Sequence, residues 1–106
     1  MSLTFNKLRK ANVIRCRESF HANGVMEWSP TDWATAMAGE CGEACNFIKK
    51  MRRGDKVKTR DVAKELADLV IYVDLLAARL NISLGDIVKS KFNEVSRKKN
   101  SKVFLK

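Results

Sequence analysis

Two long segments of the chain, residues 30–53 and 59–81, have apolar residues at helical spacing, and both carry acids on the apolar face. At about 100° per residue, Glu40 lies at the centre of the first apolar face and Glu65 lies on the second. An unpaired charge is costly to bury, so each carboxylate needs a compensating partner. Any fold of this chain must therefore bring these acids to a cation.

Capping signals predict where the helices begin and end. Ser29 with Asp32, and Ser83 with Asp86, have the spacing of a capping box at a helix N-terminus. Gly54 follows a basic run and is expected to end the second helix. The predicted helices cover approximately residues 4–21, 30–53, 59–81 and 84–99.

The loops between these helices are short, and no segment alternates between apolar and polar residues as a strand would. The sequence therefore predicts an all-α fold, a four-helix bundle, in a single domain over residues 1–106. The longest apolar segment, residues 66–80, is too short and too charged to span a bilayer. The N-terminus has no signal-peptide pattern, so we expect a cytoplasmic protein.

The third predicted helix is apolar on nearly every side. Leu66, Val70 and Ile71 all lie away from the Glu65 face. A helix that is apolar all round is buried all round, and a chain this short cannot cover it alone. We therefore expect a homo-oligomer, at least a dimer.

The two acidic positions are pairs, because Glu43 follows Glu40 by one turn and Asp68 follows Glu65 by one turn. Four carboxylates that face one another cannot all stay ionised without cations. One explanation is a buried network with Lys or Arg. The other is a divalent metal, since carboxylate oxygens suit Mg²⁺ or Mn²⁺. Basic residues are scarce on these inner faces, which favours the metal.

These acids also carry a family resemblance. The pattern Glu40-x-x-Glu43, 21 residues, Glu65-x-x-Asp68 resembles the ExxE…ExxD signature of the MazG-like all-α nucleoside triphosphate pyrophosphohydrolases. The flanking sequences "WSPTDWATAMAGECGEACNFIKKMRR" and "KELADLVIYVDLLAARLNISLGDIVKSKFNEVS" are similar to the short single-domain members. The resemblance covers about residues 28–97, with an N-terminal helix before this core and a basic tail after it.

The resemblance implies a MazG-like helical fold assembled as an intertwined dimer or dimer of dimers. It implies Mg²⁺-dependent hydrolysis of a (d)NTP to a (d)NMP and pyrophosphate, with Mn²⁺ as a possible substitute, in housecleaning of the nucleotide pool. A metal-activated water would attack the α-phosphorus. The catalytic and metal-binding residues would be Glu40, Glu43, Glu65 and Asp68.

Substrate contacts are predicted in three places. Basic residues just past the first acidic pair could meet the phosphates, although cations at a helix end are also ordinary. Aromatic residues on the inner faces could stack on a base or could be core. The resemblance adds contacts on the last helix. The predicted residues are Trp33, Lys49, Lys50, Arg53, Tyr72, Lys91 and Asn93.

The net charge of +9 leaves other functions open. A small basic helical protein that binds nucleic acid would explain the charge, but it would not explain the acids that face the core. A MazG-like protein that has lost catalysis and acts through interactions would keep the fold, but all four acids are present. The sequence therefore favours the enzyme, with a nucleotide and not a nucleic acid as its partner.

Overall fold

The computed structural model describes residues 2–106, and every regular element in that range is helical. Four α-helices follow one another along the chain, with two short turns of other helical types between the first and second. In order, the elements are α1 (Phe5–Arg15), a π-helical turn (Cys16–Phe20), a 3₁₀ turn (Gly24–Glu27), α2 (Pro30–Arg53), α3 (Thr59–Arg79) and α4 (Leu84–Lys98). The predicted all-α class is confirmed.

The caps of α2 are those that the sequence predicts. The Ser29 hydroxyl accepts a hydrogen bond from the Asp32 backbone N–H (3.1 Å), and the Asp32 carboxylate accepts one from the Ser29 N–H (3.0 Å). Gly54 ends the helix at φ 96°, a left-handed conformation that glycine adopts without a steric penalty. The predicted box at Ser83 is wrong, because its hydroxyl makes no capping bond. Ser83 has ψ 98°, against 163° at Ser29, so the two caps differ in backbone geometry.

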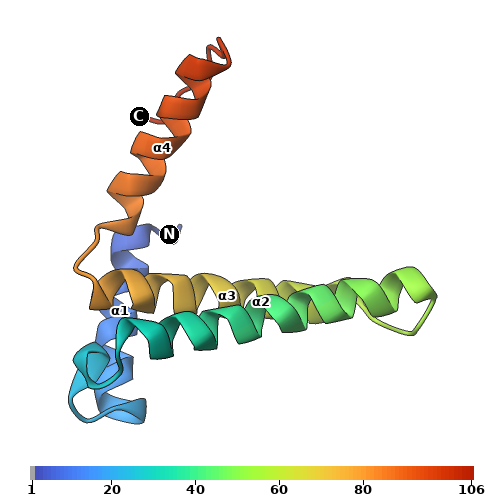
Figure 1. Cartoon of the computed structure of the whole chain (residues 1–106), viewed down its shortest axis with the longest axis horizontal. Helices are drawn as coiled ribbons and strands as arrows, with labels where there is room; N and C mark the ends of the chain where they lie inside the picture. The colour runs from blue at the N-terminus through green and yellow to red at the C-terminus, as the bar shows by residue number, and fades with distance from the viewer. Residues whose placement is uncertain (1) are drawn as a thin grey trace.

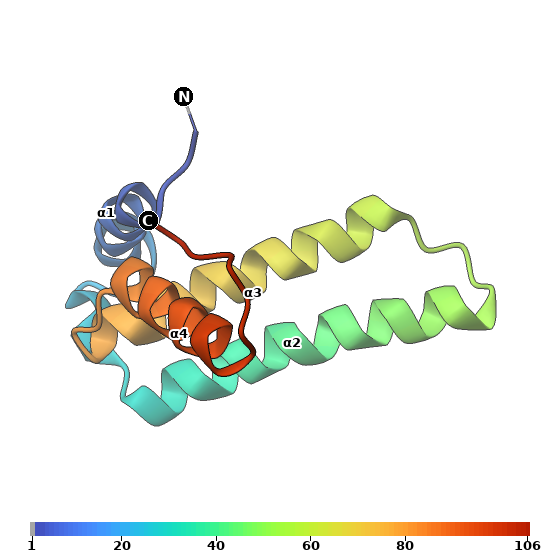
Figure 2. The same cartoon turned by 90° about the horizontal axis from the view of Figure 1, so that it is seen from above.

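The helices form an open, L-shaped molecule. Figure 1 shows α2 and α3 as an antiparallel hairpin, with α1 across its base and α4 directed away from it, and Figure 2 shows the same arrangement from above. The radius of gyration is 16.3 Å, whereas a compact domain of this length has about 13 Å. Within one chain, the four helices therefore do not pack as the predicted four-helix bundle. The reason is that α4 touches the base at α1 and does not lie along the hairpin.

The buried core lies at the base of the hairpin. Cys16, Trp33 and Leu75 form its centre, and Trp28 and Tyr72 pack against them. These residues come from the π-helical turn, the loop before α2, and both hairpin helices. The core therefore fixes the base of the hairpin, beside which the candidate site lies.

Asp74 attaches α1 to α3. Its side chain is fully buried and accepts hydrogen bonds from Arg9 Nε (3.0 Å) and Asn12 Nδ2 (3.1 Å). A buried carboxylate is tolerated here because both oxygens have donors and one donor is cationic. Phe5 and Phe20 are 41% and 69% exposed, whereas the polar Asn12 is buried and faces α3.

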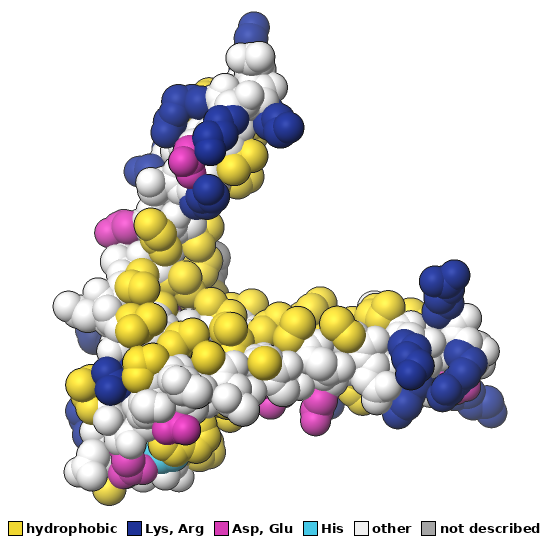
Figure 3. Space-filling model, viewed as in Figure 1, with side chains coloured by type: hydrophobic (Ala, Val, Ile, Leu, Met, Phe, Trp, Pro, Cys, Tyr) yellow, Lys and Arg dark blue, Asp and Glu magenta, His cyan; other side chains and the backbone are white. Residues whose placement is uncertain are grey.

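Large apolar side chains remain uncovered on both arms of the molecule. Leu66 and Val70 on α3 are 50% and 46% exposed, and Ile87, Phe92 and Val95 on α4 are 51%, 43% and 44% exposed. Figure 3 shows hydrophobic surface running along the inner angle between the hairpin and α4. No helix in residues 2–106 has the length and apolar character that crossing a membrane would require.

Candidate functional site

Three carboxylates meet between the two helices of the hairpin. Glu40 and Glu43 lie one turn apart on α2, and Glu65 faces them from α3. One oxygen from each lies within 4.8 Å of the others. No Lys or Arg in the described part of the chain forms an ion pair with any of them. The arrangement is therefore an acidic cluster without a protein cation, and the alternative of a Lys or Arg network is not formed.

The environment of Glu65 is unfavourable to a charged carboxylate. Desolvation, together with the nearby Glu40 and Glu43 carboxylates, raises the pKa of Glu65 to about 7. Its Oε2 is shielded from solvent and has no hydrogen-bond partner. A buried acceptor normally has a hydrogen-bond partner. Binding of a cation or a proton would satisfy this oxygen. Carboxylate oxygens are the ligands that a hard divalent ion such as Mg²⁺ or Mn²⁺ prefers, so Glu40, Glu43 and Glu65 are the residues that could hold one.

The metal-free protein is expected to be destabilised by Glu65 as the pH rises from about 4.5 to about 7. In this window folded Glu65 holds a proton that the unfolded residue has lost, so the free energy of unfolding falls with rising pH. Glu65→Gln cannot ionise and should remove this contribution. Denaturant titrations in a chelator, compared between wild type and Glu65→Gln, isolate the effect. A difference that does not change with pH would contradict the raised pKa.

Asp68, the fourth predicted ligand, is outside this cluster. Its side chain is exposed and lines a neighbouring pocket, one helical turn beyond Glu65 on α3. An aspartate is one methylene shorter than a glutamate, and Asp68 lies about 60° around the helix from Glu65. The structure thus brings three of the four acids together, and ligation by Asp68 stays a prediction.

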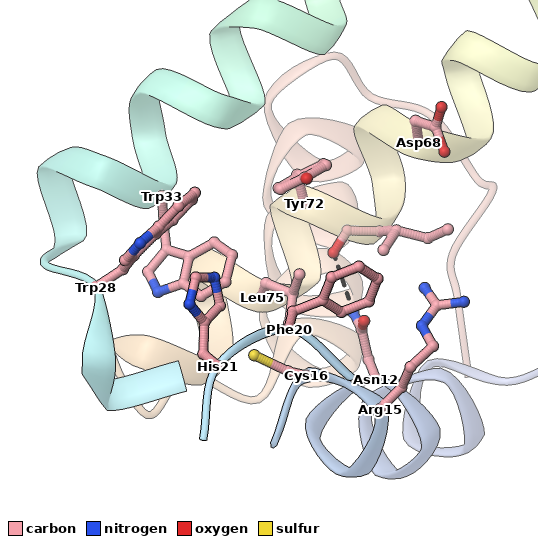
Figure 4. A pocket seen from close by; sticks show the side chains of 11 residues that line it. Asn12, Arg15, Cys16, Phe20, His21, Trp28, Trp33, Asp68, Tyr72 and Leu75 are labelled. Atoms are coloured by element: carbon pink, nitrogen blue, oxygen red, sulfur yellow. Dashed lines mark hydrogen bonds between the residues drawn. The ribbon is translucent and has the colours of Figure 1, made fainter. Parts of the chain in front are cut away.

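The neighbouring pocket has a volume of about 380 Å³ and an aromatic wall. Trp28 and Trp33 have ring centroids 4.7 Å apart, and His21 lies 4.6 Å from Trp28. Tyr72 lies 6.3 Å from Trp33 on the α3 side. Figure 4 shows these rings around one cavity, with Asp68 at its far edge. Asp68, one turn from Glu65 on α3, therefore lies between the pocket and the acidic cluster, and none of the three clustered acids lines the pocket itself.

Hydrogen bonds hold two of these rings in place. Trp33 Nε1 donates to the Val25 backbone carbonyl (2.9 Å), and His21 Nδ1 lies 2.5 Å from Glu27 Oε2. Trp33 is 2% exposed, so it is both core and pocket wall. Sequence reasoning assigns no site role to His21 and expects it only to end the first helix. The signal in the sequence that could have indicated a role for His21 is the group of aromatic residues along positions 20–33.

The predicted phosphate contacts on α2 lie beyond the cluster. Arg53 pairs with Asp55, and Lys50 Nζ lies 5.7 Å from the Phe47 ring centroid. Lys49 is exposed and forms no ion pair in residues 2–106. Lys49 is six residues, about 9 Å along the helix axis, past Glu43. The structure therefore does not bring these residues to the acids.

The predicted contacts on α4 have other partners. Lys91 Nζ pairs with Glu94 (2.9 Å). The Asn93 side chain donates to the Leu105 carbonyl (3.0 Å) and accepts from the Leu105 N–H (2.8 Å), which ties the C-terminal tail to α4. Since α4 points away from the hairpin, its residues do not line the aromatic pocket. A substrate role for Lys91 and Asn93 stays a prediction.

Comparison with known proteins gives no match: no family model, curated protein or solved structure is similar enough to this chain to be matched.

Proposed function

We propose that this protein is a Mg²⁺-dependent nucleoside triphosphate pyrophosphohydrolase of the MazG-like type. The observation that carries the proposal is the cluster of Glu40, Glu43 and Glu65, with the unpartnered Oε2 of Glu65, beside an aromatic pocket. Three acids without a protein cation suit the binding of a divalent ion and, through it, phosphate. The paired acid motif of the sequence points to the same chemistry.

The pocket binds the base of the nucleotide, and the acidic cluster acts on its phosphates. The half-buried Trp28 and Tyr72 offer aromatic faces for a nucleobase, and Trp33, which is only 2% exposed, packs behind them. Asp68 belongs to the pocket edge and follows Glu65 by one turn, so a bound nucleotide extends its phosphates toward the acids. A divalent ion held there would neutralise phosphate charge and make water more acidic. A carboxylate of the cluster orients the attacking water and accepts its proton.

The test is a panel of canonical and modified (d)NTPs with Mg²⁺, followed by pyrophosphate release and chromatography of the nucleotide product. We expect turnover of at least one (d)NTP, abolished by a chelator and restored by Mg²⁺. A panel with no turnover would reject the enzyme and leave the alternative of a catalytically silent interaction protein.

The exposed apolar surfaces of α3 and α4 support self-association as part of this proposal. Leu66 and Val70 on α3 and Ile87, Phe92 and Val95 on α4 are all exposed, and Figure 3 shows hydrophobic surface in the inner angle between the two arms. A contiguous apolar surface of this kind is unusual on a monomer and typical of an obligate interface. A second copy that fills the angle would complete the helical packing that one chain lacks.

We expect light scattering to give the mass of a dimer or a tetramer at micromolar concentration. Phe92→Glu places a charge on the apolar face and should reduce the mass or the stability of the assembly. Lys99→Glu changes a nearby exposed position of the same chain and should leave the mass unaltered. A monomer of wild-type protein would contradict this assembly.

A further inference from the structure

The free end of the α2–α3 hairpin is densely basic. Residues 49–60 contain seven basic side chains and one acid, Asp55. Figure 3 shows Lys and Arg gathered around this end of the molecule. The basic residues are Lys49, Lys50, Arg52, Arg53, Lys56, Lys58 and Arg60. By contrast, residues 24–48, which lead up to it, contain no Lys or Arg.

Most of these charges have no ion-pair partner in residues 2–106. Arg53 pairs with Asp55, and the other six form no ion pair in the described part of the chain. Arg52 is nine residues past Glu43, roughly 14 Å along the helix axis, so the acidic cluster does not compensate them. Like charges held this close repel one another and attract polyanions.

We propose that this hairpin end binds the phosphate backbone of a nucleic acid, independently of base sequence. Lys and Arg on both helices and on the connecting loop can reach successive phosphates of one duplex. The sequence analysis disfavours a nucleic-acid partner, because nucleic-acid binding does not explain the acids that face the core. The structure separates the acids from the basic end, so one chain accommodates both.

The chemistry of this end favours a nucleic acid over a lipid surface. Met51 and the adjoining Ile48 are 36% and 50% exposed, but no other large hydrophobic side chain in residues 48–60 is exposed, so this end offers little apolar surface to a bilayer. The α4 arm is a weaker candidate for the polyanion. It also carries seven basic residues, but over positions 89–106, and Glu94 pairs with Lys91 and Lys98. Its apolar face is moreover assigned above to self-association.

The test uses the full chain in a chelator and a short fluorescein-labelled DNA duplex, followed by anisotropy over about 50 to 200 mM salt. The tip variant is Arg52→Gln/Lys58→Gln/Arg60→Gln. Its matched control is Lys89→Gln/Lys99→Gln/Lys102→Gln, which removes the same charge from exposed positions on and after α4. Circular dichroism and light scattering establish that each variant keeps the helicity and mass of wild type.

We expect wild type to bind with micromolar affinity and the tip variant to bind at least about tenfold more weakly at physiological salt. The slope of log K against log salt should become shallower by up to about 2.7, or roughly 0.9 for each phosphate that the variant no longer neutralises. The control should keep most of the affinity and slope. Equal losses in the two variants, or a larger loss in the control, would overturn the proposal.

Two further measurements complete the test. In wild-type protein, the duplex should protect Lys56 and Lys58 from acetylation more than Lys99 and Lys102, and the opposite pattern would overturn the proposal. Stronger binding to phosphatidylserine vesicles than to the duplex would also overturn the proposal and would indicate a membrane surface as the partner. Because no measurement involves turnover, failure here leaves the proposed enzyme function intact, and failure of the enzyme leaves this result intact.

Discussion

Glu40→Gln, Glu43→Gln and Glu65→Gln are each expected to lower (d)NTP turnover by at least about a hundredfold. Each change keeps the size and polarity of the side chain and removes its negative charge. In a cluster whose oxygens lie within 4.8 Å, loss of one charge weakens the hold on a divalent ion and on the phosphates that it contacts. The measurement is steady-state pyrophosphate release at saturating Mg²⁺.

The fold should survive these three changes. No Lys or Arg in residues 2–106 forms an ion pair with these acids. Replacing one acid by Gln therefore leaves no cation without its partner. Glu65→Gln should even stabilise the metal-free protein above pH 7, because it removes repulsion. Glu18→Gln, an exposed change away from the pocket, is the control and should keep activity. Full activity in any two of the three variants would contradict a shared site.

Asp68→Asn tests whether Asp68 is a metal ligand, as the motif predicts, or a substrate contact, as its position at the pocket edge indicates. The motif assigns Asp68 the same role as the other acids, whereas its side chain lies at the edge of the aromatic pocket and outside the three-acid cluster. A hundredfold loss of turnover would support ligation by Asp68 in the working enzyme. A rise in KM with turnover unchanged would instead support a substrate contact at the pocket edge.

Asp74→Ala is expected to lower the free energy of unfolding by about 3 kcal/mol. The change leaves the Arg9 guanidinium without its anion and removes one acceptor of the buried Asn12 amide. Arg9 Nη2 already lacks a partner in the described chain, so there is no spare acceptor to replace the carboxylate. Arg9 retains a side-chain exposure of 25%, which places the cost at the low end for a broken buried pair.

Urea denaturation at a fixed protomer concentration measures this cost, because assembly also contributes to stability. The double variant Arg9→Met/Asp74→Leu removes both charges and should be less destabilised than the sum of its single changes by about 1 kcal/mol or more. If the free energy of unfolding of Asp74→Ala is within about 0.5 kcal/mol of the wild-type value, the bonds of Asp74 to Arg9 and Asn12 do not hold α1 on α3.

The sequence predicted both ends of α2 because local signals determine them, although the same signal failed at Ser83. Ser29, Asp32 and Gly54 define α2 through bonds and backbone angles within a few residues, and these were found as predicted. The convergence of Glu40 and Glu65 could also be predicted, since a short loop between amphipathic helices places their apolar faces together. The first result depends on contacts within a few residues, and the second on the short loop that joins two successive helices.

Other features depend on packing that helical periodicity does not describe. The direction of α4 follows from its contact with α1, where Gly85 lies against Phe5, 80 residues away in the chain, and helical periodicity does not predict that pairing. The inward position of Asn12 follows from its bond to Asp74, 62 residues away. The place of His21 in the pocket wall follows from the chain turning at the π-helical segment. These long-range contacts explain why the pocket and the open shape were not predicted.

The central claim concerns where a nucleoside triphosphate is cleaved, and hydrolysis in ¹⁸O-labelled water tests it most directly. With the base in the aromatic pocket and the phosphates directed toward the acids, one in-line attack should fall on the α-phosphorus. We expect monophosphate and pyrophosphate in a single step, no free nucleoside diphosphate, and the label in the monophosphate. Label in the pyrophosphate, or nucleoside diphosphate with labelled inorganic phosphate as the first products, would contradict the account.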